Sequence, residues 1–183
     1  MEYKINIAGL NRNLPICKVN DNLYIGAFIM FGDVELTEHC ATELLKKAPD
    51  FDYIVTPEAK SIPLAYEMAK QSGKPYIVAR KMAKAYMKDA FVVHVKSITT
   101  MSVQTLVLDS QEAMLLNGKK VLIVDDVIST GESLKAVEEL VNKANGNIVA
   151  KMAPLAEGDA CKRDDIAFLA ELPLFDNEGR VLY

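Results

Sequence analysis

The chain has 183 residues, a length that corresponds to one domain with a single hydrophobic core. Half of the residues are hydrophobic and a quarter are charged, with only 9 Gly and 7 Pro, which excludes a disordered, collagenous or low-complexity chain. The formal net charge of −4 gives no general attraction to nucleic acid.

The sequence also bears on location and on cysteine chemistry. The longest apolar stretches, such as Val121–Val124, are far shorter than the roughly 18 to 20 residues that span a bilayer. The first residues contain no apolar block of the roughly 7 to 15 residues typical of a secretory signal, so we expect a cytoplasmic protein. Cys17, Cys40 and Cys161 are widely spaced and form no Cys-x-x-Cys pair. We therefore expect them to be buried small apolar residues, not disulfides or zinc ligands.

Hydrophobic periodicity predicts an alternation of helices and strands from residue 33 onward. In chain order the expected elements are a helix over about 36–47 capped by Asp33, a strand over 53–55 ending at Thr56–Pro57, a helix over 63–69 ending near Gly73, a strand over 75–79, a hairpin arm over 91–95, strands over 104–108 and 121–124, a helix over 133–143, and a strand that begins over 146–152. Strands that alternate with helices form βαβ units, so we expect an α/β fold with a mostly parallel twisted sheet. The first thirty-odd residues are too irregular to be assigned elements.

One segment, VLIVDDVISTGES over residues 121–133, combines an apolar strand, two acids and a hydroxyl-rich turn that opens a helix. Hydroxyls and backbone N–H groups at a helix N-terminus bind phosphate well, because unsatisfied donors and the helix dipole both favour an anion there. The candidate residues for such a cradle are Ser129, Thr130, Gly131 and Ser133. The adjacent carboxylates of Asp125 and Asp126 are able to accept hydrogen bonds from the vicinal hydroxyls of a sugar.

The alternative for this turn is an ordinary helix start. In that case Ser129 or Thr130 caps the helix, and the two acids complement its dipole. Neither G-x-x-x-x-G-K-S/T nor G-x-G-x-x-G occurs in the chain, so the best-known phosphate and dinucleotide motifs are excluded.

The segment over 121–133 resembles the phosphoribosyl diphosphate (PRPP) motif of the type I phosphoribosyltransferases. Two further segments are similar to the adenine and xanthine enzymes of that family. YIVTPEAKSIPLA over 53–65 resembles their Glu-Ala-Arg-Gly or Glu-Ala-Ser-Gly pyrophosphate loop, and PYIVARK over 75–81 resembles their strand ending in Arg-Lys. The resemblance extends over about residues 50–175. Lys60–Ser61 replaces the usual Arg-Gly or Ser-Gly, and Glu132 stands where the purine enzymes often have Gly.

The resemblance implies a fold and a function. It implies a single phosphoribosyltransferase domain over 1–183, in which a parallel sheet is flanked by helices and a small hood is formed by residues 1–32 and the C-terminal tail. It implies transfer of the ribose 5-phosphate of PRPP to a purine base, which gives a nucleoside monophosphate and pyrophosphate, as in purine salvage. It also implies that Mg²⁺ is carried largely by PRPP without an all-protein metal site, and that the enzyme is a homodimer. From the net charge and the short apolar stretches we expect neither nucleic acid nor a membrane as a partner.

The resemblance further implies roles for individual residues. The catalytic residues, which contact the ribose, are Asp125 and Asp126. The 5′-phosphate loop comprises Ser129, Thr130, Gly131, Glu132 and Ser133. The candidate pyrophosphate-binding residues are Glu58, Ala59, Lys60, Ser61, Arg80, Lys81 and Lys84. The candidate base-binding residues are Glu157 and Val127.

Positive charge is concentrated in residues 70–107, which contain seven basic residues and one acid. A solvated basic face is the ordinary explanation for such a stretch. A substrate with both a 5′-phosphate and a pyrophosphate requires a concentration of this kind. We expect the loop from about Met82 to Ser97 to be mobile and to close over the site, with Lys84 and Lys88 as weaker pyrophosphate candidates.

The sequence favours one class of base and leaves alternatives open. Residues 82–100 contain no Glu, whereas the adenine enzymes have one in the closing loop, and Glu157 falls where the xanthine enzymes carry a base-contacting Glu. These two features favour a 6-oxopurine over adenine, although Glu157 as a plain surface residue is the alternative. A non-catalytic regulator of the same fold that senses PRPP or a purine is a second class of function. Residues 1–32 are too short and too poor in basic residues for the DNA-binding domain of such a regulator.

Overall fold

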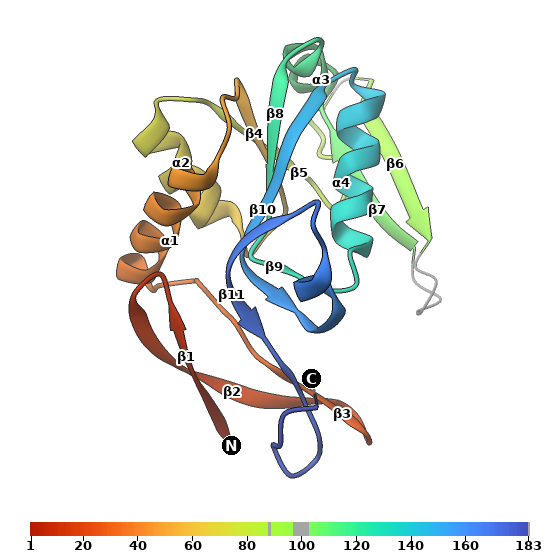
Figure 1. Ribbon diagram of the computed structural model, residues 1–183. Coiled ribbons are helices and arrows are strands. Elements are labelled where there is room, and N and C mark those ends of the chain that lie inside the picture. Colours follow the sequence, from red (N-terminus) through yellow and green to blue (C-terminus); the bar gives the residue numbers. More distant parts are fainter. Residues whose placement is uncertain (88, 97–102, 183) are drawn as a thin grey trace.

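The chain forms two β-sheets with helices around the larger one (Figure 1). The computed structural model describes residues 1–87, 89–96 and 103–182. The strands of the larger sheet are β4 (Tyr53–Pro57), β5 (Tyr76–Ala79), β8 (Lys120–Val124), β9 (Val127–Ile128), β10 (Asn147–Glu157) and β11 (Ala167–Leu172). They are parallel and lie in the order β11-β10-β8-β4-β5, with the short β9 paired to β10. The predicted α/β fold with a mostly parallel sheet is confirmed.

Helices cover both faces of this sheet. They are α1 (Val34–Lys47), α2 (Ile62–Ser72), α3 (Ser110–Leu116) and α4 (Glu132–Lys143), with a 3-10 helix over Gly158–Lys162. The first two pack against each other on one face, while α4 lies on the other face (Figure 1). The antiparallel hairpin of β6 (Phe91–Lys96) and β7 (Val103–Leu108) packs beside α4. No helix in the described ranges is long and apolar enough to span a membrane.

The central strand β8 is buried on both faces, which explains its continuous apolar sequence. Val121 and Ile123 belong to the core under α4, whereas Leu122 and Val124 belong to the core under α1 and α2. Alternate side chains of a strand point to opposite faces of the sheet, so one strand supplies both cores. The two acids that follow β8 are therefore held at the end of a rigid, completely packed strand.

Local sequence signals set the ends of the helices. The side chain of Asp33 accepts a hydrogen bond from the backbone N–H of Leu36 at 3.1 Å, as predicted for the cap of α1. Gly73 ends α2 in the left-handed conformation, with a φ of 68°. The sequence reasoning did not predict α3. Its signal is a capping box, in which Asp109 accepts from the N–H of Gln111 and Glu112 accepts from the N–H of Asp109.

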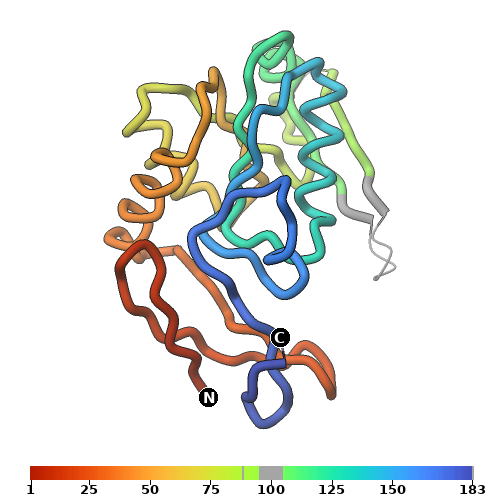
Figure 2. Tube along the Cα trace, viewed as in Figure 1, coloured from red at the N-terminus to blue at the C-terminus, as the bar shows by residue number. Residues whose placement is uncertain are grey.

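The smaller sheet is antiparallel and joins the two ends of the chain. Its strands are β1 (Glu2–Ile7), β2 (Leu10–Asn20), β3 (Leu23–Gly26) and β12 (Leu174–Phe175), in that order. Both termini lie together at the end of the molecule away from α3 (Figures 1 and 2). Phe175 is completely buried, with its ring centroid 5.1 Å from that of Tyr3. The irregular first thirty residues thus form a sheet whose last strand comes from the opposite end of the chain.

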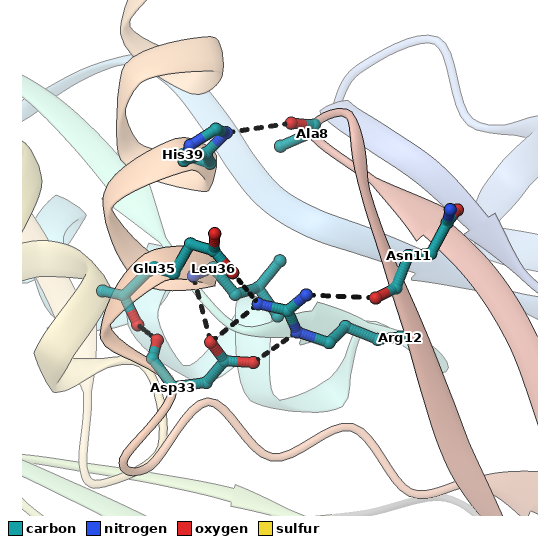
Figure 3. A network of polar contacts seen from close by, with 8 residues as sticks. Ala8, Asn11, Arg12, Asp33, Glu35, Leu36 and His39 are labelled. Atoms are coloured by element: carbon teal, nitrogen blue, oxygen red, sulfur yellow. Dashed lines mark hydrogen bonds and ion pairs between the residues drawn. The ribbon is translucent and has the colours of Figure 1, made fainter.

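A network of polar contacts connects β2 of this sheet to the start of α1 (Figure 3). The guanidinium of Arg12 donates to both carboxylate oxygens of Asp33, at 2.6 and 3.0 Å, and to Glu35 at 2.8 Å. The pKa of Asp33 is lowered, chiefly by its hydrogen bond from Arg12. His39 and the backbone oxygen of Ala8 lie 3.3 Å apart in the same region. The smaller sheet is thereby fixed to the main domain.

The three cysteines are free and lie in different environments. Cys40 is completely buried on α1 and Cys161 is half-buried, as expected of small apolar residues. Cys17 is exposed, so the expectation that all three are buried is wrong. The reason is its position on β2, whose second half carries mostly exposed side chains and lies away from the described helices (Figure 1).

Candidate active site

A cavity of about 690 Å³ lies at the carboxyl ends of β4 and β8. Along the sheet the chain proceeds from β4 to β5 in one direction and from β8 to β10 and β11 in the other. The loops after β4 and β8 therefore diverge to opposite sides, which is the switch point where open parallel sheets bind ligands. The residues that line the cavity are Pro57, Glu58, Ala59, Lys60, Ser61, Lys81, Thr105, Leu106, Asp125, Asp126, Val127 and Ser133.

The carboxylates of Asp125 and Asp126 directly follow β8 and are both buried. Asp125 accepts a hydrogen bond from the backbone N–H of Asp126 at 2.9 Å and one from Ser133 Oγ at 3.4 Å. Burial, and then the neighbouring charge of Asp126, raise the pKa of Asp125 to about 7. The oxygen Oδ2 of Asp126 forms an ion pair with Lys60 Nζ at 2.7 Å. The predicted ribose residues thus lie together on the cavity.

The loop between β4 and α2 contributes the opposite wall. Ser61 is buried, and its hydroxyl accepts from Thr56 Oγ1 at 2.7 Å and donates to the backbone oxygen of Pro57 at 3.1 Å. The carboxylate of Glu58 accepts from the backbone N–H of Lys81 at 2.9 Å, which connects this loop to the end of β5. The Glu58–Ala59 peptide is cis. The four predicted residues 58–61 all line the cavity.

The basic residues after β5 are divided between the cavity and its surroundings. Lys81 lines the cavity, whereas Arg80 and Lys84 are not among the described residues that do. The backbone of Arg80 pairs with that of Val107 through hydrogen bonds of 2.9 and 2.8 Å. Its Nε is buried without a hydrogen-bond partner among the described residues. Lys88 and Ser97 lie outside the described residues, whereas residues 91–96 of the predicted closing loop form strand β6.

The hydroxyl-rich turn surrounds a second, smaller cavity of about 110 Å³. This cavity and the larger one share Asp125, Val127 and Ser133. The further residues that line it are Ile128, Ser129, Thr130, Gly131, Glu132 and Leu134. All five predicted 5′-phosphate residues therefore surround one small space next to the carboxylates.

Gly131 is the N-cap of α4 and has a φ of 81°, in the left-handed region that favours glycine. No side chain caps the helix here. The alternative in which Ser129 or Thr130 serves as an ordinary helix cap is therefore wrong, because the chain turns into the helix at glycine. Side-chain capping does not occupy the first N–H groups of α4, which suits an anion site.

The two predicted base residues lie on neighbouring strands. Val127 lines both cavities. Its strand β9 pairs with β10 up to Ala156, which places Glu157 directly beyond the paired residues. Glu157 is half-buried, and its burial raises its pKa while the charge of Lys60 acts in the opposite direction. Glu157 is not among the described residues that line either cavity.

Sequence reasoning missed the contribution of β7. Thr105 and Leu106 line the large cavity because Val107, their neighbour, pairs with Arg80 at the end of β5. Nothing in the local sequence predicts this pairing, since it joins residues 27 apart by long-range backbone hydrogen bonds. Among the described residues there is no group of three or more His, Cys, Asp or Glu side chains arranged to hold a metal ion.

A comparison with protein-family models identifies the family to which the chain belongs. The model of the phosphoribosyl transferase domain matches residues 35–175, a range that contains both loops and both carboxylates. The chain belongs to this family. The predicted enzyme class, a phosphoribosyltransferase, is confirmed.

Relatives by sequence place this phosphoribosyltransferase in the purine branch, as predicted. The adenine phosphoribosyltransferase of Kosmotoga olearia is 29% identical over 146 residues, which cover 79% of this chain and 83% of the relative. The adenine phosphoribosyltransferase of Thermotoga neapolitana is 35% identical over 132 residues, which cover 72% of this chain and 66% of the relative. The hypoxanthine/guanine phosphoribosyltransferase of Methanothermococcus okinawensis is 36% identical over 115 residues, which cover 62% of this chain and 59% of the relative.

Solved structures support the fold. The adenine phosphoribosyltransferase of Thermoanaerobacter pseudethanolicus matches with a TM-score of 0.67 at 21% identity, over 78% of this chain and 84% of that chain. The adenine phosphoribosyltransferase of Saccharomyces cerevisiae matches with a TM-score of 0.61 at 21% identity, over 76% of this chain and 80% of that chain. At these identities the likeness concerns the fold of the phosphoribosyltransferase, not its choice of base.

Proposed function

We propose that this phosphoribosyltransferase transfers the ribose 5-phosphate of PRPP to a purine base and releases pyrophosphate. The observation that carries the proposal is the position of Asp125 and Asp126. Their buried carboxylates lie between the 58–61 loop, which carries Lys60, and the hydroxyl-rich 129–133 loop, and the cavities on the two sides share Asp125 in their walls. A sugar with a phosphate at one end and a pyrophosphate at the other requires groups in that order.

Each part of PRPP has a chemically matched group in the site. The ribose hydroxyls donate hydrogen bonds to the two carboxylates. The 5′-phosphate accepts from the hydroxyls of residues 129–133 and from the first N–H groups of α4. The pyrophosphate binds beside Lys60 and Lys81 on the opposite wall. Arg80 and Lys84 are further candidate ligands of the pyrophosphate in this proposal, although neither lines the cavity among the described residues.

Lys60 changes partner when the substrate binds. In the free protein its ammonium is 2.7 Å from Asp126, so that it occupies the carboxylate that the ribose requires. When the hydroxyls of PRPP reach this carboxylate, Lys60 is released toward the pyrophosphate oxygens. Both charges keep a partner throughout, which avoids the several kcal/mol that an unpaired buried charge costs.

The chemistry requires little covalent participation by the protein. The bond between ribose and pyrophosphate breaks as a base nitrogen approaches C1, and positive charge develops on the sugar. The chain orients the two reactants, neutralises the leaving pyrophosphate with Lys60 and Lys81, and excludes water. Mg²⁺ bound to PRPP supplies further stabilisation of the leaving group, and the oxygens of Asp125 and Asp126 are the ligand type that this ion prefers.

Adenine is the base that we propose to test first. Several relatives are named as adenine enzymes and one as a hypoxanthine/guanine enzyme, and these names give no support to the 6-oxopurine preference inferred from the sequence. An ionised carboxylate accepts hydrogen bonds from a ring N–H or an exocyclic amino group, so Glu157 is able to serve adenine as well as a 6-oxopurine.

The test is a substrate screen with the purified protein. PRPP and Mg²⁺ are supplied with adenine, hypoxanthine, guanine, xanthine, orotate or uracil, and both pyrophosphate and nucleotide are quantified. The proposal expects turnover with at least one purine and none with the pyrimidines. Binding of PRPP without turnover of any base would refute it in favour of a PRPP-sensing regulator, and turnover of orotate or uracil would refute the purine assignment.

We also propose that the enzyme acts as a homodimer in the cytoplasm. The dimer is implied by the resemblance to the family, and sedimentation at micromolar concentration tests it. A monomeric mass in the presence of PRPP and Mg²⁺ would contradict it, while the substrate screen is independent of this outcome.

A further inference from the structure

Arg163 lies directly against the turn that surrounds the smaller cavity. It follows the 3-10 helix over Gly158–Lys162, and its guanidinium points at Gly131. A Cβ atom placed on Gly131 would be 2.6 Å from Arg163 Nη1 and 3.9 Å from its Cζ. The space beside the glycine is therefore filled by the guanidinium. Gly131 is required both for its left-handed backbone and for the room that it leaves for Arg163.

The guanidinium is held in a fixed orientation. Its Nε and Nη2 donate to the two carboxylate oxygens of Asp165, each at 2.8 Å, in a bidentate pair. This pair leaves Nη1 facing the turn, and none of the hydrogen bonds found among the described residues engages that nitrogen. The pKa of Asp165 lies well below its usual range, chiefly because of the hydrogen bond from Arg163.

A second pair of charges anchors Asp165 to the core of the domain. Lys151 on β10 donates to Asp165 and also forms an ion pair of 2.7 Å with Glu138 of α4. Lys151 is only 17% exposed, which limits the screening of these contacts by water. The four residues join β10, α4 and the chain after the 3-10 helix. Arg163 is thus positioned by the same helix whose N-terminus begins at the turn.

The turn itself lacks a cation. Residues 129–133 contain three hydroxyls, one glycine and the acid Glu132, and Glu132 lines the small cavity. A 5′-phosphate near pH 7 carries between one and two negative charges, which hydroxyls and backbone N–H groups alone do not neutralise. Among the described residues that line the smaller cavity there is no cation, and Lys60 and Lys81 line the larger one. Arg163 does not line the smaller cavity itself but adjoins it at Gly131.

We propose that Arg163 is the cation of the 5′-phosphate site, with Nη1 as the donor to the phosphate and Asp165 as the residue that orients it. The inference rests on the proposed function, because it assigns a ligand to the phosphate subsite of that reaction. It extends the site to a segment that follows β10, thirty residues beyond the end of the PRPP-like motif.

The experiment measures binding of ribose 5-phosphate and of pyrophosphate to the wild-type protein and to Arg163→Gln, Arg163→Lys and Arg180→Gln by calorimetry. Arg180 is a matched control, because it is a surface arginine paired with Asp176 and Glu178 and is 67% exposed. Arg163→Gln is expected to weaken ribose 5-phosphate roughly tenfold or more, the usual effect of losing one charge-assisted hydrogen bond. Its affinity for pyrophosphate, and both affinities of Arg180→Gln, are expected to change less than about twofold.

Arg163→Lys separates charge from structure. Lysine keeps the positive charge but cannot form the bidentate pair with Asp165. If Arg163 binds phosphate, lysine retains most of the affinity that glutamine loses. Equal losses in both variants would show that the arginine only holds the turn in place, and unchanged binding in Arg163→Gln would also refute the proposal. If the wild-type protein binds neither ribose 5-phosphate nor PRPP, the proposed function fails and this inference with it.

A measurement on the wild-type protein covers the case in which the variants do not fold. The side chain of Arg163 is 31% exposed, so an arginine-specific dicarbonyl reagent is able to reach it. Mass spectrometry then locates the modified residues. Ribose 5-phosphate is expected to protect Arg163 and not Arg180, and equal modification of Arg163 with and without this ligand would overturn the assignment.

Discussion

Asp125→Asn is expected to make the free protein more stable at neutral pH while it removes a ribose ligand. Asp125 is 6% exposed, and its pKa is raised from 3.8 to about 7, first by burial and then by the charge of Asp126. A carboxyl whose pKa is higher in the folded state favours folding when protonated. Between the two pKa values the unfolded chain loses the proton and the folded chain retains it, so stability falls as pH rises. Above about 7 both states are ionised and the loss is complete.

The size of the effect follows from this interval. Each pH unit corresponds to about 1.4 kcal/mol, so the whole interval corresponds to on the order of 4 kcal/mol in the wild type and is absent in the asparagine variant. Asparagine keeps an oxygen that accepts the 2.9 Å hydrogen bond from the N–H of Asp126. The variant is therefore expected to gain stability over the wild type between pH 4 and pH 8, and to lose most of its activity at pH 8.

The assay is urea unfolding of both proteins at pH 4 and pH 8, without substrate. At each pH the unfolding free energy of the wild type is subtracted from that of the variant. The value at pH 4 is then compared with the value at pH 8, because effects of asparagine on packing are the same at both and cancel. A matched control is Asp165→Asn, at a carboxyl whose pKa is lowered chiefly by its hydrogen bond from Arg163. For this variant the difference is expected to stay nearly constant from pH 4 to pH 8, because the Asp165 carboxyl of the wild type is ionised in both folded and unfolded states over most of that interval. The same difference at pH 4 and pH 8 for Asp125→Asn would refute the assignment of a buried, weakly acidic carboxyl.

Three further variants test the roles proposed in the site. Asp126→Asn is expected to lower turnover at saturating base about tenfold or more, roughly 1.4 kcal/mol, because a ribose contact is lost; steady-state kinetics check this, and unchanged kinetics would remove the residue from the site. Ser129→Ala combined with Thr130→Ala is expected to raise the apparent KM for PRPP, since hydroxyl donors are lost, and an effect on the KM of the base alone would place the phosphate elsewhere. Glu157→Gln is expected to alter the relative turnover of different purines more than the affinity for PRPP. The expected change is roughly 1 to 3 kcal/mol, the cost of leaving a buried polar group without its partner, and competition assays between purines measure it.

The sheet and the main site loops are predictable from the sequence because their signals are local. The apolar run Val121–Val124 is typical of a strand buried on both faces, and it forms β8. The acids after it and the loop after β4 come together because parallel strands place their carboxyl ends at one edge of the sheet. Two short motifs that are more than sixty residues apart in the sequence therefore predict one cavity.

The features that sequence analysis missed depend mainly on long-range pairing. Residues 1–32 look irregular because their strands lie in a small sheet that is completed by Leu174 and Phe175, at the other end of the chain. Thr105 reaches the cavity only through the pairing of β7 with the end of β5. The position of Arg163 beside Gly131 likewise follows from how β10 and α4 pack. By contrast, α3 has a local signal in Asp109 and Glu112 that the sequence analysis did not use.

The positive charge of Lys60 offsets the repulsion between the carboxylates that lie close together in the site without substrate. Asp125 and Asp126 are adjacent and buried, an arrangement in which the two negative charges oppose each other. The ammonium of Lys60 pairs with Asp126 and also acts on Glu157, so that one cation balances acids from two loops. A neutral residue at position 60 would leave Asp126 without this partner. In the proposed function this lysine, which departs from the usual Arg-Gly or Ser-Gly of the family, lies between the ribose, pyrophosphate and base sides of the site. We expect PRPP to release it by supplying hydroxyls to the carboxylate and phosphate oxygens to the ammonium.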